Sequence, residues 1–148
     1  MDDLKTVINK LKAFSFKDEM IAVITQNKDT IPDMQAEQLA IGLKSDGNKI
    51  LPEYAPFTIQ EKMRKTGLSG VYNHVTFYDT GELYSSLTAE ITGENYDVKS
   101  PSFKWAKAIK RSGKRIVGLT EANRSEFAKT ITLPGVKKAL EAKTGLVF

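Results

Sequence analysis

Apolar residues recur at helical spacing through the first third of the chain. The first stripe consists of Leu4, Val7, Ile8, Leu11 and Phe14. The second stripe consists of Met20, Val23, Ile24 and Ile31. Ser15 with Asp18 is typical of the start of the helix that carries this second stripe. Because proline is tolerated best in a first helical turn, Pro32 predicts a third helix that runs to about Gly42, and residues 1–42 are expected to be helical.

The next segment contains turn signals. Asp46-Gly47 lies between the short apolar-bearing arms of residues 43–51. This dipeptide indicates a hairpin, because glycine accepts the positive φ of a tight turn. Pro52 and Pro56 then bracket a loop, and residues 58–65 are predicted to form one or two helical turns.

From Leu83 the hydrophobic period changes to two. One face of the predicted strand consists of Leu83, Ser85, Leu87, Ala89 and Ile91. The opposite face consists of Tyr84, Ser86, Thr88, Glu90 and Thr92. We expect the first face to be buried and the second to be exposed or at an interface. The turn Gly93-Glu94-Asn95 returns the chain through Tyr96 and Val98, so that residues 43–100 are expected to be mainly β.

Helix signals return after this predicted hairpin. Ser102 is a suitable N-cap for a helix that runs to about Arg111 and is ended by Gly113. Residues 116–119 are interpreted as a short extended piece.

Two further helices are predicted near the end of the sequence. Thr120 is expected to cap the first, while Pro134 starts and Gly145 stops the second. Residues 101–148 are therefore expected to be mainly helical. The predicted class is α+β in a single domain over 1–148, with N-terminal helices, a central antiparallel β-sheet with hairpins, and C-terminal helices.

Composition removes several classes of function. The 148 residues contain no cysteine, which excludes a disulfide framework, a zinc-thiolate site and a cysteine nucleophile. No apolar run approaches the roughly 20 residues of a membrane-spanning helix, so no membrane partner is expected. The net charge of +4 is mild and neither demands nor excludes binding to nucleic acid.

The triplet Asp79-Thr80-Gly81 matches the one with which aspartic proteases present their catalytic carboxylate. That chemistry needs two aspartates that share a proton, and a single triplet could supply them only in a homodimer. Glu82 follows where that family has a small residue, and the mainly helical prediction differs from its β-rich fold. We favour a structural turn, in which Asp79 accepts a hydrogen bond from its own downstream amide and Gly81 supplies the free φ before a strand at Leu83.

Other catalytic arrangements have less support. His74 is the only histidine, and no G-x-S-x-G motif is present to expose Ser85 or Ser86 as a nucleophile. His74, Asp79 and Glu82 match no standard metal-ligand spacing, and no glycine-rich phosphate-binding motif occurs. No catalytic residue, cofactor or metal is therefore expected.

Residues 99–115 form the most basic segment, with seven lysines and arginines and no acid. On a helix, several of these cations line one face, beside an apolar face that contains Ile109. The candidate interaction residues are Lys104, Trp105, Lys107, Arg111, Lys114 and Arg115. The segment fits either a solvated helix face over a buried stripe or a surface that meets phosphate or an acidic neighbour.

Three short motifs carry a resemblance to a known family. They are QAEQLAIGLKSDGNKILPEY with the lysine-bearing TIQEKMRK, then VTFYDTGELYSSLTAEI, and last IVGLTEANRSEFAKTI. In this order they resemble the virion-morphogenesis and tail-completion (neck) proteins of tailed bacteriophages and prophages. The matching elements are a Thr-Gly-x-Leu turn at Thr80 to Leu83, followed by Ser86-Leu87, and an apolar-Gly-Leu-Thr element from Val117 through Asn123.

The resemblance implies a non-enzymatic structural protein of the virion. Such proteins act as copies in a ring at the head–tail junction or tail, and are assembled in the cytoplasm of the host bacterium. The implied partners are further copies of the chain and other phage head–tail or tail proteins, with a possible DNA contact through the basic face. Two alternatives remain open: a homodimeric aspartic peptidase using Asp79-Thr80-Gly81, and a small nucleic-acid-binding module.

Overall fold

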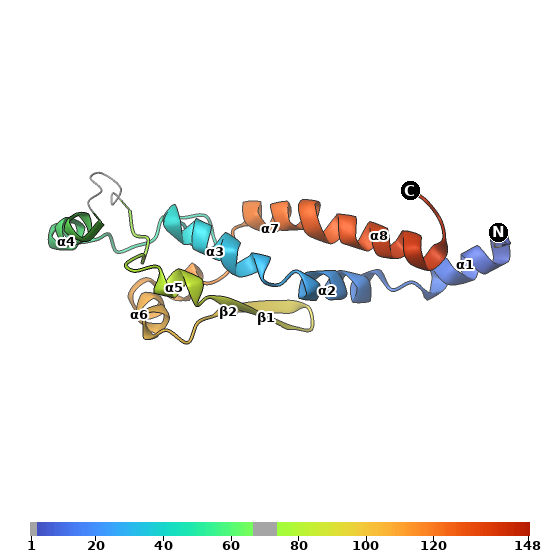
Figure 1. Cartoon of the computed structure of the whole chain (residues 1–148), viewed down its shortest axis with the longest axis horizontal. Helices are drawn as coiled ribbons and strands as arrows, with labels where there is room; N and C mark the ends of the chain where they lie inside the picture. The colour runs from blue at the N-terminus through green and yellow to red at the C-terminus, as the bar shows by residue number, and fades with distance from the viewer. Residues whose placement is uncertain (1–2, 67–73) are drawn as a thin grey trace. The chain divides into compact units, whose positions relative to one another are not determined.

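The structure is a computed structural model that describes residues 3–66 and 74–148 (Figure 1). The α+β class is confirmed, with N-terminal helices, a two-stranded antiparallel sheet and C-terminal helices. The chain divides into two compact units, Met1–Asn27 with Ser125–Phe148, and Lys28–Arg124. We call them the helical unit and the central unit. The single domain over 1–148 stays a prediction.

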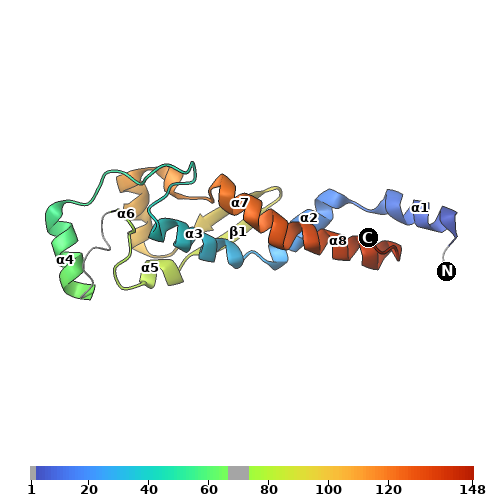
Figure 2. The ribbon, with the colours of Figure 1, turned by 90° about the horizontal axis from the view of Figure 1, so that it is seen from above.

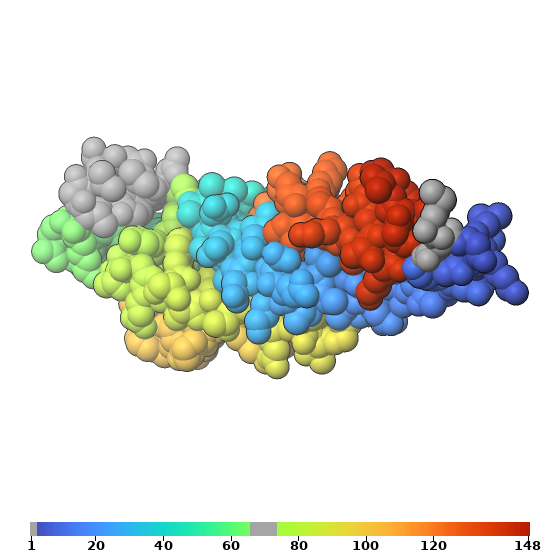
Figure 3. Space-filling model, turned by 45° about the vertical axis from the view of Figure 1, so that its right-hand side comes forward, coloured from blue at the N-terminus to red at the C-terminus, as the bar shows by residue number. Residues whose placement is uncertain are grey.

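The helical unit is built from α1 (Leu4–Ala13), α2 (Phe16–Gln26), the π-helical segment η2 (Ala128–Thr132) and α8 (Leu133–Thr144). Figure 3 shows the atoms of α8, in red, directly against those of α2, in blue. Their approach is close, because a Cβ atom added at Gly135 would lie 2.5 Å from the side chain of Val23. The predicted caps Ser15 and Gly145 are both confirmed.

Pro134 lies at the start of the last helix, as predicted, but no loop separates that helix from the one before it. Helix α7 (Glu121–Phe127), η2 and α8 follow one another without a break in the chain. Pro134 lies in the first turn of α8, directly after the π-helical segment. Proline has no amide hydrogen and cannot donate a backbone hydrogen bond. Its position at the change from π- to α-helical hydrogen bonding therefore removes a donor where the regular bonding pattern is already interrupted.

The central unit contains α3 (Thr30–Ala40), α4 (Pro56–Thr66), α5 (Glu82–Ser85), α6 (Phe103–Ser112) and the 3₁₀ turn η1 (Lys114–Ile116). Its sheet pairs β1 (Thr88–Thr92) with β2 (Asn95–Lys99) in antiparallel register. Figures 1 and 2 both show this hairpin beside α3. The predicted turn at Gly93-Glu94-Asn95, the Ser102 and Thr120 caps and the Gly113 helix end are confirmed.

The strand predicted from Leu83 is wrong in its first part. Residues 82–85 form the helical turn α5, and the strand begins only at Thr88. Leu83 and Leu87 are nevertheless both buried, as is Ala89. A spacing of four residues places two side chains on one face of a strand and also on one face of a helix, so this pair fits either period. Tyr84, expected on the exposed face, is only partly exposed, and its hydroxyl donates to the carbonyl of Thr76 at 2.6 Å.

Four other boundaries differ from the predictions. The 43–51 hairpin is reduced to one antiparallel bridge, Leu43 with Lys49, around the turn at Gly47. Helix α4 is longer than the expected one or two turns. Residues 116–119 begin in a 3₁₀ turn and become extended only at Val117. The third helix begins at Thr30, which places Pro32 within its first turn.

Two buried glutamines of α3 hold residues 116–120 in the central unit. Gln35 donates to Ile116 O at 3.0 Å and accepts from Gly118 N at 2.7 Å. Gln38 donates to Gly118 O at 2.9 Å and accepts from Thr120 N at 2.8 Å. We call this arrangement the glutamine joint. Both side chains satisfy backbone groups that would otherwise be buried without partners.

None of the helices in residues 3–66 and 74–148 is long and apolar enough to span a membrane.

Candidate functional site

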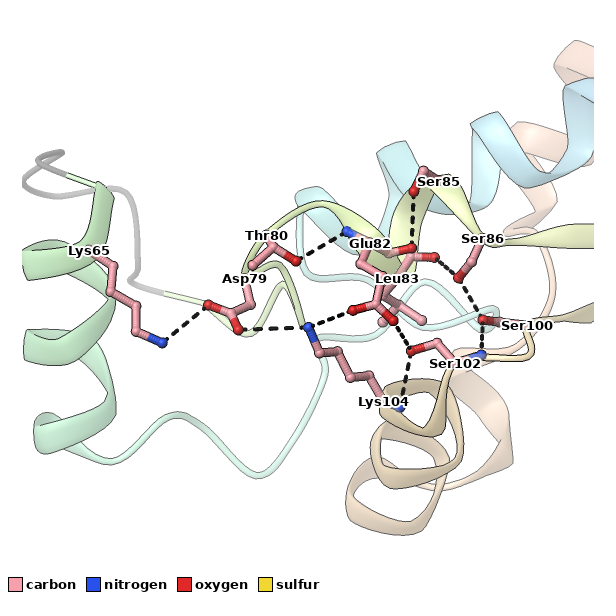
Figure 4. Close-up of polar contacts among 10 residues, drawn as sticks. All are labelled: Lys65, Asp79, Thr80, Glu82, Leu83, Ser85, Ser86, Ser100, Ser102 and Lys104. Carbon is pink, nitrogen blue, oxygen red and sulfur yellow. Dashed lines mark hydrogen bonds and ion pairs between the residues drawn. The ribbon is translucent and has the colours of Figure 1, made fainter.

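The Asp79-Thr80-Gly81 turn leads into helix α5 and not directly into a strand (Figure 4). Gly81 has φ +86°, a left-handed conformation that glycine adopts without steric cost. The hydrogen bond across the turn comes from Thr80, whose Oγ1 accepts from Glu82 N at 3.4 Å. The expected role of Gly81 is therefore confirmed. The side chain that accepts a hydrogen bond from a downstream amide is that of Thr80, whereas we had predicted Asp79.

The carboxylate of Asp79 is used in ion pairs. It lies 3.4 Å from Lys65 Nζ of α4 and 3.8 Å from Lys104 Nζ of α6. Figure 4 shows the Lys104 ammonium between the carboxylates of Asp79 and Glu82, the second at 3.2 Å. The hydrogen bond from Lys104, followed by that from Ser102, holds the pKa of Glu82 below its ordinary value. Lys104 thus links the turn to helix α6.

A row of serine hydroxyls continues this link. Ser102 Oγ donates to Glu82 Oε1 at 3.1 Å and caps α6 through Lys104 N at 3.3 Å. Ser100 Oγ accepts from Ser102 N at 3.0 Å and lies 2.7 Å from Ser86 Oγ. The motif residues therefore fix α5 to the start of α6, which is a positioning role.

The serine–histidine pair considered from the sequence is not formed in the described part of the chain. Ser85 Oγ donates to Glu82 O, and Ser86 Oγ donates to Leu83 O. The His74 imidazole lies 2.6 Å from Ala40 O. Within residues 3–66 and 74–148, no three histidine or acidic side chains gather to hold a metal ion.

Beside the turn, an open groove of about 510 Å³ lies between α4 and α6. Its cationic lining consists of Lys62, Lys65, Lys104, Lys107 and Arg111. Its carboxylate lining consists of Glu61 and Asp79, and its apolar lining consists of Phe77, Leu83, Phe103 and Ala108. Cations thus outnumber carboxylates five to two among the described lining residues, over a partly apolar floor.

The guanidinium of Arg111 is held in place at one end of this groove. It lies 5.3 Å from the ring centre of Tyr54 and 5.9 Å from that of Phe77. Its Nη2 donates to Glu53 O at 2.9 Å. Phe77 has φ +56°, an uncommon conformation for a residue with a side chain. The Tyr54 hydroxyl accepts from Phe77 N at 2.8 Å and so supports this conformation.

The structure separates the six candidate interaction residues. Lys104, Lys107 and Arg111 line the groove. Trp105 is 4% exposed and its Nε1 donates to Val98 O at 3.3 Å, so the ring belongs to the core of the central unit and presents no face for stacking. The remaining two, Lys114 and Arg115, do not line the groove. Arg115 pairs instead with Asp46 at 3.3 Å.

The lysines of α4 were missed by the sequence analysis. Lys62 and Lys65 lie three residues apart, which places them on one side of a helix. That spacing could have indicated a basic side of the helix. Lys62 donates to Tyr78 O and lies 5.1 Å from the ring centre of Tyr54. Which of the two sides of α4 faces α6 depends on tertiary packing and could not be derived from the spacing alone.

Comparison of the chain with protein-family models, with curated proteins and with solved structures gives no match.

Proposed function

We propose that this chain is a non-enzymatic structural protein that assembles with copies of itself, as a ring at the head–tail junction or tail of a tailed phage or prophage virion. The proposal joins the motif resemblance to one structural observation, the exposed apolar surface of the helical unit. Assembly would take place in the host bacterial cytoplasm.

The exposed apolar surface carries the proposal. Of the thirteen large apolar side chains that are exposed in the described chain, eight belong to the helical unit. They are Leu4, Ile8, Leu11, Phe16, Met20, Leu133, Val147 and Phe148. Apolar side chains that gather on an exposed surface mark sites that contact another protein, so these residues are the candidates for a contact between subunits.

Helix α1 shows the feature most clearly. It is amphipathic, yet none of its residues is buried. Leu4, Ile8 and Leu11 follow one another at spacings of four and three and are 76%, 40% and 38% exposed. An amphipathic helix normally buries its apolar stripe, so this face is suited to a contact between subunits.

The glutamine joint supports the resemblance in another way. Gln35 and Gln38 belong to the first motif of the resemblance, and Gly118 and Thr120 belong to the last. Their hydrogen bonds join segments about 80 residues apart. The motifs therefore act together as one structural unit, as expected of a shared fold.

The two alternatives receive less support. In a peptidase, the second aspartate of a dimer would have to displace the two lysines that pair with Asp79. A nucleic-acid module would use the basic surface of residues 99–115, but Trp105, the ring of that segment considered for stacking on a base, is buried. Pepstatin-sensitive cleavage of an acid-denatured protein, lost in Asp79→Asn, would support the peptidase.

Light scattering and electron microscopy of the purified protein test self-assembly. We expect a mass of several subunits and ring-shaped particles. The triple variant Leu4→Gln, Ile8→Gln and Leu11→Gln should reduce the mass toward that of one chain. The control Thr6→Ala with Asn9→Ala changes the opposite face of α1 and should leave the mass unchanged.

A monomer at high protein concentration, alone and with candidate head–tail proteins, would overturn the assembly proposal. The phage assignment has its own test, which is mass spectrometry of tailed particles induced from the source bacterium. The chain should be found in the purified particles, and its absence from them would overturn the virion assignment.

A further inference from the structure

We propose that the groove between α4 and α6 binds an acidic peptide segment of a partner protein, in which an apolar side chain is flanked by carboxylates. The groove lies within the central unit, and the inference does not depend on ring formation or on a place in a virion.

The charge of the lining favours an acidic ligand. Five cations and two carboxylates face the groove among the described residues. The two carboxylates, Glu61 and Asp79, each have an ion-pair partner already, in Arg64 at 2.9 Å and in Lys65 at 3.4 Å. The groove lining therefore keeps a net positive charge, which favours a negatively charged ligand.

The apolar floor favours a peptide over a free anion. Among the apolar residues that line the groove, Phe103 is 66% exposed, and Leu83 and Ala108 are buried. An apolar side chain of a ligand can cover Phe103 and remove its surface from water. A small inorganic anion would gain nothing from this part of the groove.

The aromatic rings favour a peptide over nucleic acid. Single strands are held by bases that stack on open aromatic faces. Here the ring of Phe77 is faced by Arg111 at 5.9 Å, and that of Phe103 by Lys107 at 5.4 Å. A base that stacked on the same ring faces would have to displace these cations, whereas a carboxylate can bind them where they lie.

Two of the cations are positioned before any ligand arrives. Arg111 is held by Glu53 O and by two rings, and Lys104 by Asp79 and Glu82. A ligand therefore orders fewer side chains on binding, which reduces the entropic cost. Lys65 and Lys107, at the exposed edges, remain able to adjust to the ligand.

Fluorescence anisotropy with a labelled peptide of sequence EDFDE tests the proposal on the full chain. We expect saturable binding that weakens as salt is added. The uncharged peptide QNFNQ should not bind, and a peptide with alanine in place of the central phenylalanine should bind more weakly. A labelled oligothymidylate of about 12 nucleotides, within the usual site size for single strands, serves as the nucleic-acid probe.

A matched pair of variants locates the binding. Lys107→Glu should weaken binding of EDFDE by about tenfold or more, the scale expected for reversing a charge in an ion-paired contact. Lys110→Glu makes the same charge change on the same helix but outside the groove lining, and should have little effect. Phe103→Ala, at an exposed side chain, gives a second groove variant that should also weaken binding.

Three results would overturn the proposal. They are equal binding of EDFDE and QNFNQ, equal weakening by Lys107→Glu and Lys110→Glu, and tighter binding of the oligothymidylate than of the peptide with the same dependence on Lys107.

Discussion

The glutamine joint and the basic groove are both polar regions of the central unit, yet they satisfy their polar groups in opposite ways. In the joint, Gln35 and Gln38 are 0% and 1% exposed and their amides bond backbone groups of 116–120. In the groove, the charged side chains lie at an open surface and the cations outnumber the acids. The polar groups of the joint are hydrogen-bonded within the chain, whereas the groove lining keeps a net positive charge.

This difference separates stability from binding. A buried polar group without a partner loses its hydrogen bonds to water and forms none in the protein. Changes in the joint should therefore destabilise the fold. Exposed charges stay hydrated and contribute little to folding, so changes in the groove should affect binding. The variants below test that separation.

The largest effect is expected at Trp105 of α6, in comparison with Phe103 on the same helix. Trp105→Ala removes a buried ring and should lower the free energy of unfolding by about 3–5 kcal/mol. Phe103→Ala, at a groove residue two positions away, should change it by about 0.5 kcal/mol or less. Urea denaturation measures both. Similar losses in the two variants would show that the groove side of α6 is part of the core.

A smaller loss is expected in the glutamine joint. Gln38→Ala leaves Gly118 O and Thr120 N without their side-chain partner and should cost about 1–3 kcal/mol, the usual penalty for a buried group left unpaired. Amide hydrogen exchange at Thr120 should become faster. Gln60→Ala, at an exposed glutamine of α4, is the control and should leave both quantities unchanged. An equally stable Gln38→Ala protein would contradict the assigned role.

The turn beside the groove should respond to backbone strain more than to lost charge. Gly81→Val forces a residue with a side chain to φ +86°, which should cost about 1–2 kcal/mol or more. The added Cβ would also lie 3.3 Å from the Tyr78 hydroxyl. Asp79→Asn removes two partly exposed ion pairs and should cost about 1 kcal/mol or less. Thermal unfolding measures both variants. A melting temperature lowered more by Asp79→Asn than by Gly81→Val would make the charge of Asp79 the main determinant of the turn.

The smallest effect is expected in acid. The folded pKa of Glu82 lies below its ordinary value of 4.5, because of Lys104 first and Ser102 second. Its contribution to stability is therefore fully present above about pH 4.5 and is lost as the pH falls through the folded pKa. Glu82→Gln should flatten the acid limb of a stability–pH curve relative to the unchanged protein. Identical acid limbs in Glu82→Gln and the unchanged protein would rule out this linkage.

The sequence predicted best those features that depend on neighbouring residues. Ser102 and Gly113 bound α6 because a hydroxyl cap and a glycine with positive φ act within one helical turn. The hairpin turn after Thr92 is local in the same sense. The strand boundary failed at Leu83 and Leu87 because their spacing satisfies both the helical and the strand period.

The non-local features could not be read from the sequence. No local pattern singles out Gln35 and Gln38, since their hydrogen-bond partners lie about 80 residues away. The groove needed both α4 and α6, and only α6 was singled out as a basic surface. Trp105 was included with the candidate interaction residues, and the structure places it in the core.

Amide chemical shifts measured by NMR during a titration with the EDFDE peptide test the separation of groove and joint most directly. The account predicts that the resonances of residues lining the groove, such as Lys65 and Lys107, shift with saturation. It also predicts that the amide resonances of Gly118 and Thr120, in the glutamine joint, do not shift. Shifts concentrated at the joint, or no saturable shift at the groove, would contradict it.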